Sequence, residues 1–207
     1  MRGEIMKRSN LWKFLPLSAA LLSIVLFVSA GGAEKQNKPF KWSLALQNVK
    51  TGELVPFSAP IKSETGGQFR LIISPESSCY AYVVAESSNT DDLAVLYAGS
   101  IKAGESWTSN VLILSPPKGS ESLFVVTSMT EQAGLAKMID AFNSSPGVTQ
   151  RRALMGEVMR IRGVVSQNKE APEKPVLMGA TSRGSGSGDG VEFSGLDTYV
   201  KTISLEH

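Results

Sequence analysis

The sequence predicts a mainly β fold, an antiparallel β-sandwich with a two-helix insertion before the last strand. Three observations lead to this prediction. About seven short segments of strand character, separated by polar or Gly- and Pro-containing turns, occur between residues 41 and 128. The spacing of apolar residues then becomes helical over residues 131–168, and strand character returns near the end of the chain. Sheets and helices of this kind bury their apolar faces by packing in layers.

The clearest strands lie within residues 68–99. Apolar side chains at every second position predict a half-buried strand over residues 68–74. Residues 79–86 are apolar on both faces, which is typical of a central strand that is covered on both sides. Residues 93–97 complete the group. Because short turns connect these strands, we expect consecutive ones to pair in antiparallel fashion.

Four further strands are expected before the helices. Residues 41–47 alternate in polarity and predict the first strand of the domain. Residues 54–57 should be a short edge strand, because the proline in this segment cannot donate to a central ladder. Residues 111–114 and 122–128 are the last two, and the spacing of the set favours a sandwich.

Two helices should follow and lie against the sheet. Ser128 and Glu131 stand at the spacing of a capping box, which predicts that the first helix begins there. The second helix should run from roughly Thr149 to Gln167, weakened by Gly156 and Gly163. The apolar stripes consist of Leu135, Met138, Ile139 and Phe142 in the first helix and Leu154, Val158, Ile161 and Val165 in the second. Arg151, Arg152, Arg160 and Arg162 lie largely outside the second stripe, on a face that is either solvated or in contact with anionic lipid.

The remainder of the chain should close the domain. Residues 169–175 contain two prolines and predict a linker, and residues 176–180 predict a brief strand. The Gly- and Ser-rich residues 181–190 predict a mobile surface loop. Residues 198–205 have strand character and should pair back into the sandwich. Residues 40–207 are therefore predicted to be a single β-sandwich domain.

Residues 1–30 are predicted to be a signal peptide. Basic residues precede an almost unbroken apolar run over residues 14–28, and small residues close the run at Val28-Ser-Ala30. We expect cleavage after Ala30, or after Ala33 as a second choice, and export to the periplasm or the cell surface.

An uncleaved leader is the alternative. Residues 14–30 would then anchor the protein in the inner membrane, since about 17 apolar residues lie at the lower limit for a spanning helix. Residues 31–39 are polar and are expected to be a disordered lead-in. Either Met1 or Met6 is the true start of the protein.

Charge and cysteine content limit the classes of partner. Residues 1–30 hold four of the 21 basic residues and one of the 19 acidic ones, so the remainder carries 17 basic and 18 acidic residues. This near-neutral balance does not predict a nucleic-acid partner. Cys79 is the only cysteine, so no internal disulfide can form, and it is expected to be a small buried side chain rather than a reactive thiol.

Several strand motifs together resemble the bacterial domain-of-unknown-function 4384 family. They are Gly67–Ser74, Cys79–Glu86, Val95–Tyr97, Lys102–Glu105, Pro116–Glu121 and Leu123–Ser128. The resemblance covers residues 57–128, with a return at 199–205, and its motifs bear on fold rather than catalysis. It implies an immunoglobulin-like sandwich of an envelope or surface protein, sometimes attached to an enzyme. The helices and the Gly- and Ser-rich loop depart from the family pattern.

No coherent catalytic constellation can be assembled from the sequence. Ser115 and Lys118 have the spacing of penicillin-recognising enzymes, but the two prolines between them prevent the helical turn that this site needs. His207, the only histidine, is expected at a frayed end of the chain, where it cannot serve a triad. One Cys and one His cannot form a closed zinc site. Asp91 and Asp92 could contribute to a Ca²⁺ site, but aspartates are common in turns for backbone reasons, and we expect that role here.

The sequence thus predicts a non-catalytic binding or structural module of the bacterial cell envelope, with no cofactor and no metal. An unidentified envelope protein is the expected partner. The expected contact surface is the helical insertion around Met138, Phe142, Met155 and Met159, because flexible Met side chains suit an adaptable surface. The competing interpretation is that these four residues pack inward and only complete the hydrophobic core. The alternative function is an atypical carboxylate-dependent hydrolase, or an accessory domain of one, using Glu86, Asp91, Asp92 and Glu121.

Overall fold

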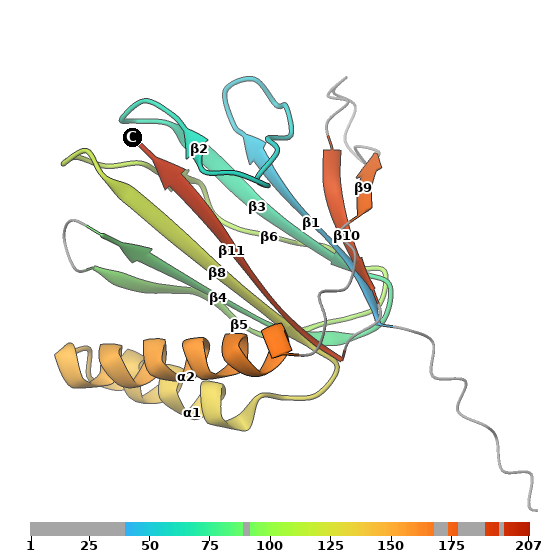
Figure 1. The fold of residues 1–207 in the computed structure, drawn as a ribbon, viewed down its shortest axis with the longest axis vertical. Coiled ribbons are helices and arrows are strands. Elements are labelled where there is room, and N and C mark those ends of the chain that lie inside the picture. The colour runs from blue at the N-terminus through green and yellow to red at the C-terminus, as the bar shows by residue number, and fades with distance from the viewer. Residues whose placement is uncertain (1–39, 89–91, 168–173, 178–188, 195–196) are drawn as a thin grey trace, which may run out of the picture. The chain divides into compact units, whose positions relative to one another are not determined.

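The computed structural model describes residues 40–88, 92–167, 174–177, 189–194 and 197–207 (Figure 1). All of them belong to one compact unit, Asn37–His207. The fold is mainly β, with antiparallel-rich sheets and two helices, as predicted. The expectations for the signal peptide, the lead-in and residues 181–188 lie outside the described residues.

The first sheet is built around the predicted first strand. Its order is β6-β3-β1-β10-β9, β7 also pairs with β3, and all pairs are antiparallel. Its strands are β1 (Lys41–Asn48), β3 (Gln68–Pro75), β6 (Trp107–Thr108), β7 (Leu112–Ile113), β9 (Lys174–Leu177) and β10 (Asp189–Ser194). In β3, Phe69, Leu71 and Ile73 are buried, which confirms the predicted inward face.

The second sheet has the order β2-β11-β8-β4-β5. Its strands are β2 (Ile61–Lys62), β4 (Cys79–Ser87), β5 (Leu93–Ile101), β8 (Ser120–Ser128) and β11 (Thr198–Glu206). All pairs are antiparallel except β2 with β11. The last strand therefore does pair back into the domain, as predicted.

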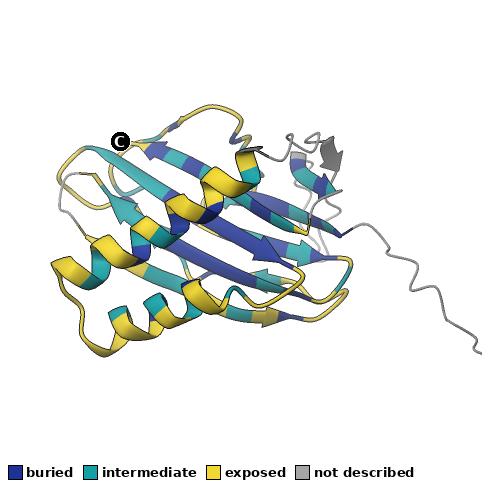
Figure 2. Cartoon of the chain, turned by 60° about the horizontal axis from the view of Figure 1, so that its bottom comes forward, coloured by how far each residue is buried: buried dark blue, intermediate teal, exposed yellow. Residues whose placement is uncertain are grey.

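Two separate cores cover the two faces of the second sheet. One core lies between the sheets and takes Val83 of β4 and Val125 of β8. The other takes their sequence neighbours Val84 and Phe124, which pack against the helices α1 (Ala133–Ser144) and α2 (Val148–Gln167). Figure 2 shows buried residues along the central strands and exposed residues on the outer side of both helices. The prediction of a central strand covered on both sides is confirmed.

Three features of the fold differ from the sequence predictions. β3 and β4 do not pair, because β3 already has β1 on one side and β6 with β7 on the other, so residues 76–78 cross between the sheets. Residues 54–57 form no strand. Leu54 makes only an isolated bridge to Gln47, although Phe57 is buried.

The third difference is β10, which begins within the predicted Gly- and Ser-rich loop. Phe193 of β10 stacks on Trp42 of β1 with ring centroids 4.4 Å apart. Tertiary packing therefore stabilises as a strand a segment whose alternating apolar and polar pattern is too short to predict one. Its partner β9 includes Pro175, which was expected in a linker. β9 ends the sheet, and an edge strand tolerates proline.

Candidate interaction surface

Helix α2 presents the surface that best fits a binding role. Its inner face carries Leu154, Val158 and Ile161, all at most 4 % exposed, which confirms the predicted apolar stripe. Because 3.6 residues make a turn, residues spaced alternately four and three apart line another side of the same helix. The α2 stripe, as we name this line, consists of Val148, Arg152, Met155, Met159 and Arg162.

The α2 stripe lies on the flank of α2 that faces away from α1. Glu157 marks the opposite flank, about half a helical turn from the stripe. A Cβ atom built on Gly134 of α1 would lie 2.6 Å from Glu157 Oε1, so that flank is in close contact with α1. The stripe contains three apolar and two basic residues, and Val148 and Met159 are 65 % and 41 % exposed.

The four residues predicted to bind a partner do not form one surface. Met138 and Phe142 of α1 are partly buried and pack against the core beneath the helices. Met155 is also partly buried against this core, whereas Met159 is exposed. Only Met155 and Met159 thus belong to the α2 stripe. Val148 was not singled out from the sequence, and Arg152 and Arg162 were expected on a solvated or lipid-facing surface rather than in one line with Met155 and Met159, which the four-three spacing would have identified.

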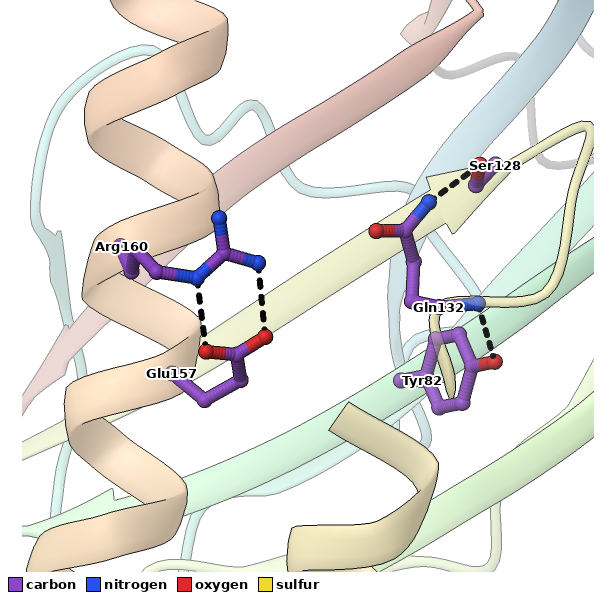
Figure 3. Close-up of polar contacts among 5 residues, drawn as sticks. All are labelled: Tyr82, Ser128, Gln132, Glu157 and Arg160. Atoms are coloured by element: carbon purple, nitrogen blue, oxygen red, sulfur yellow. Dashed lines mark hydrogen bonds and ion pairs between the residues drawn. The ribbon is translucent and has the colours of Figure 1, made fainter. Parts of the chain in front are cut away.

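Arginines of α2 form two ion pairs, one within the helix and one to the sheet. Arg160 donates to both carboxylate oxygens of Glu157, at 2.7 Å each (Figure 3). This hydrogen bonding lowers the pKa of Glu157 below its ordinary value of 4.5. Arg151 lies 3.4 Å from Glu86 of β4, which joins the helix to the sheet beneath it. Arg152 and Arg162 are exposed and remain as the basic members of the stripe.

The start of α1 is set by a sheet residue rather than by the predicted capping box. The helix begins at Ala133, and the hydroxyl of Tyr82 in β4 accepts a hydrogen bond from the backbone N–H of Gln132 at 3.1 Å (Figure 3). Ser128 ends β8 and accepts from the Gln132 side chain at 2.9 Å. The pair Ser128 and Glu131 is therefore no capping box, because the chain needs residues 129–132 to turn from the sheet to the helix.

The glutamates of the alternative hydrolase project from opposite faces of the second sheet. Glu86 continues the alternating series of β4 side chains that face the helices, and on that face it pairs with Arg151. Glu121 belongs to the alternating series of β8 side chains that face the other sheet. Asp92 is exposed, and Asp91 lies outside the described residues. These positions do not bring Glu86 and Glu121 together as an acid and base pair.

The prediction of a frayed His207 is wrong. Its backbone N–H and carbonyl both pair with Gly119 at 2.9 Å, and its imidazole is fully buried. The ring contacts Thr65 Oγ1 at 3.4 Å through Nδ1 and lies 3.8 Å from Glu121 Oε1 through Nε2. Pairing with the loop before β8 extends the ladder by one residue, which sequence alone does not reveal.

Cys79 is a buried side chain, as expected. It is 1 % exposed at the start of β4, and burial raises the pKa of its thiol to about 11. Among the described residues, no group of three or more His, Cys, Asp and Glu side chains is arranged to hold a metal ion.

Comparisons with known proteins found no matching protein family, no matching curated protein and no matching solved structure. The resemblance to the domain-of-unknown-function 4384 family therefore stays a prediction, and so does the immunoglobulin-like order of the strands. Within the described part of the chain, no helix is both long and apolar enough to cross a membrane.

Proposed function

We propose that this protein is a non-catalytic binding module of the bacterial cell envelope that holds a protein partner on the α2 stripe. The observation that carries the proposal is the composition of the stripe. Exposed Val148 and Met159 alternate with Arg152 and Arg162, and the stripe contains no acidic residue. Arg and Met are enriched at the centres of protein interfaces, where apolar burial and directed hydrogen bonds combine.

The charge of the stripe indicates the chemistry of the partner. The backbone positions of Arg152 and Arg162 are about 15 Å apart along the helix axis, so their guanidinium groups suit a surface that carries two separated carboxylates. The Met side chains between them are flexible and adapt to the apolar surface of the partner. We therefore expect the partner to contribute an amphipathic segment with an acidic edge.

Export of the protein is part of the same proposal and is supported by the pattern of residues 1–30. The protein purified from its host should begin at Gly31 or close to it and should be found outside the cytoplasm. N-terminal sequencing decides this point. A chain that begins at Met1 or Met6 and sediments with the membrane would establish the anchored form instead.

The binding surface is tested by placing a photoreactive amino acid at Met159 and, as a control, at Ala141. Ala141 is exposed on α1 and lies outside the stripe. We expect the label at residue 159 to capture a specific envelope protein that the label at residue 141 does not capture. The captured peptide should contain Asp or Glu residues beside apolar ones.

The captured protein is then purified and its affinity measured with Arg152→Glu, Arg162→Glu and the double variant. Each reversal should weaken binding roughly tenfold or more, because it replaces an attraction with a like-charge repulsion. Ala141→Glu should leave the affinity unchanged. Equal affinities for all variants would refute the role of the stripe, as would capture of anionic lipid vesicles with no protein partner.

A further inference from the structure

The α2 stripe has the spacing of a coiled-coil seam. Its five members are separated by four, three, four and three residues along the helix: Val148, Arg152, Met155, Met159 and Arg162. These are the a and d positions of a heptad pattern, whose side chains insert between those of a second helix. An extended strand has a side-chain period of two and does not match this spacing. The stripe therefore fits a partner segment that is itself an α-helix.

The stripe is directed over a part of the second sheet that is only half covered. α1 packs against β5 and α2 packs against β11, so the flank of α2 away from α1 is directed toward β2, at the end of the sheet. β11 turns Val200, Thr202 and Ser204 toward the helical side, and all three are only half-buried. A third helix along the stripe would lie over these residues and continue the helical layer.

Two glycines border the stripe on its solvent side. Gly156 and Gly163 are exposed and follow Arg152 and Met159 by four residues each. A Cβ atom built on either would meet nothing within 4 Å, so packing within the described part of the chain does not require glycine there. Glycine weakens a helix relative to alanine, but it lets a second backbone approach closely. Beside a heptad seam, this pair favours a closely packed helix.

Charge distinguishes the partner helix from a second copy of this chain. Two copies of α2 packed along the stripe would have only arginines as charged members of the interface, and like charges repel. A helix with two acidic side chains about ten residues apart would instead match Arg152 and Arg162. Its intervening seam positions should be apolar, because they face Met155 and Met159.

We propose that the partner segment on the α2 stripe is an amphipathic α-helix that packs along residues 148–162 as a third helix over β11. Two of its carboxylates pair with Arg152 and Arg162, and its backbone passes close to Gly156 and Gly163. This inference rests on the proposed function, because both require a protein partner on the stripe.

The first test measures the spacing of the partner residues along the stripe. A photoreactive amino acid is placed at Val148 and, in a second variant, at Met159 of the full chain in its host, and the captured residues are identified by mass spectrometry. The two positions are about 16 Å apart along the axis of α2. A helical partner should be captured at residues about eleven apart. Capture at residues about five apart, the spacing of an extended segment, would refute the helix while leaving the proposed function intact.

The second test uses the captured protein in purified form and measures its affinity for Gly156→Leu and Gly163→Leu. Each should weaken binding roughly tenfold or more, because the new side chain occupies the space of the partner backbone. The urea midpoint should not fall, since leucine favours a helix more than glycine does. Ala153→Leu adds bulk at an exposed site of α2 outside the stripe and should leave the affinity unchanged.

Two further outcomes separate this inference from the proposed function. Unchanged affinity in both glycine variants would refute the closely packed helix alone. If the label at residue 159 captures no other protein, or only another copy of this chain, both proposals are refuted.

Discussion

The two glycines in the middle of α2 offer a direct test of the helical layer. Gly156 and Gly163 are exposed, and a Cβ atom built on either would meet nothing within 4 Å. Alanine at each position should therefore stabilise the protein by about 0.5–1 kcal/mol, because glycine has a higher conformational entropy in the unfolded chain and exposes more helix backbone. The two sites are about 10 Å apart and share no partner, so the effects should add to about 1–2 kcal/mol.

The assay is urea unfolding followed by far-ultraviolet circular dichroism. The double variant should raise the midpoint while leaving the slope of the transition unchanged. Stabilisation by alanine requires open space for the new Cβ atom and a backbone conformation that alanine adopts without strain. Each of two control substitutions lacks one of these conditions. Gly52→Ala has open space around it but a φ of +74°, so it should destabilise the protein. Gly134→Ala gains helix propensity, but its Cβ would displace the Glu157 carboxylate, so it should stabilise less than Gly156→Ala. A double variant no more stable than the parent would refute a packed, continuous helix at residues 148–167.

Three further predictions concern the core and its titrating groups. Phe124→Ala should cost about 3–5 kcal/mol, because this side chain is 4 % exposed beneath the helices; a loss below about 1 kcal/mol in a denaturant melt would contradict the layered assignment. Pairing with Arg160 lowers the pKa of Glu157, so its contribution should be complete above about pH 4.5 and be lost as the pH falls through the lowered pKa. The difference in unfolding free energy between the parent protein and Glu157→Gln should accordingly shrink on acidification. A difference that grew instead would show that the pKa of Glu157 is raised rather than lowered. Cys79 should resist alkylation at pH 8 until the protein unfolds, because burial raises its pKa to about 11; rapid labelling of the folded protein, followed by mass spectrometry, would disagree.

The elements that the sequence identified are those in which local pattern and final burial agree. β1, β3, β4 and β8 alternate or are apolar on both faces as their environments require, and the inner stripe of α2 occupies the predicted positions. Sequence did not reveal which strands share a sheet. The crossing after β3 depends on which edges are already occupied, and no local signal carries that information.

The residues of the candidate interaction surface were predicted only in part, for a related reason. Flexible Met side chains suit a binding surface, yet Met138 and Phe142 pack inward, because α1 and α2 share one apolar layer with the sheet. Exposure depends on where the second helix lies over the sheet, and the sequence does not determine that position. The spacing of Arg152, Met159 and Arg162 is visible in the sequence, but only the contact of Glu157 with α1 shows that this line of residues faces away from the other helix.

Burial of the second sheet on both faces also has a consequence for strand register. In a sheet with one wet face, a slip of one residue exposes every apolar side chain, so polarity prevents it. β4 lacks this protection, because a slip would only exchange one apolar core for the other. Side-chain size prevents the slip instead, since it would bring Tyr80 and Tyr82 into the positions between the sheets that the small Cys79 and Ala81 occupy. The Tyr82 hydroxyl reaches the backbone N–H of Gln132 in this register alone. The helices thus help to determine the register of the strand against which they pack.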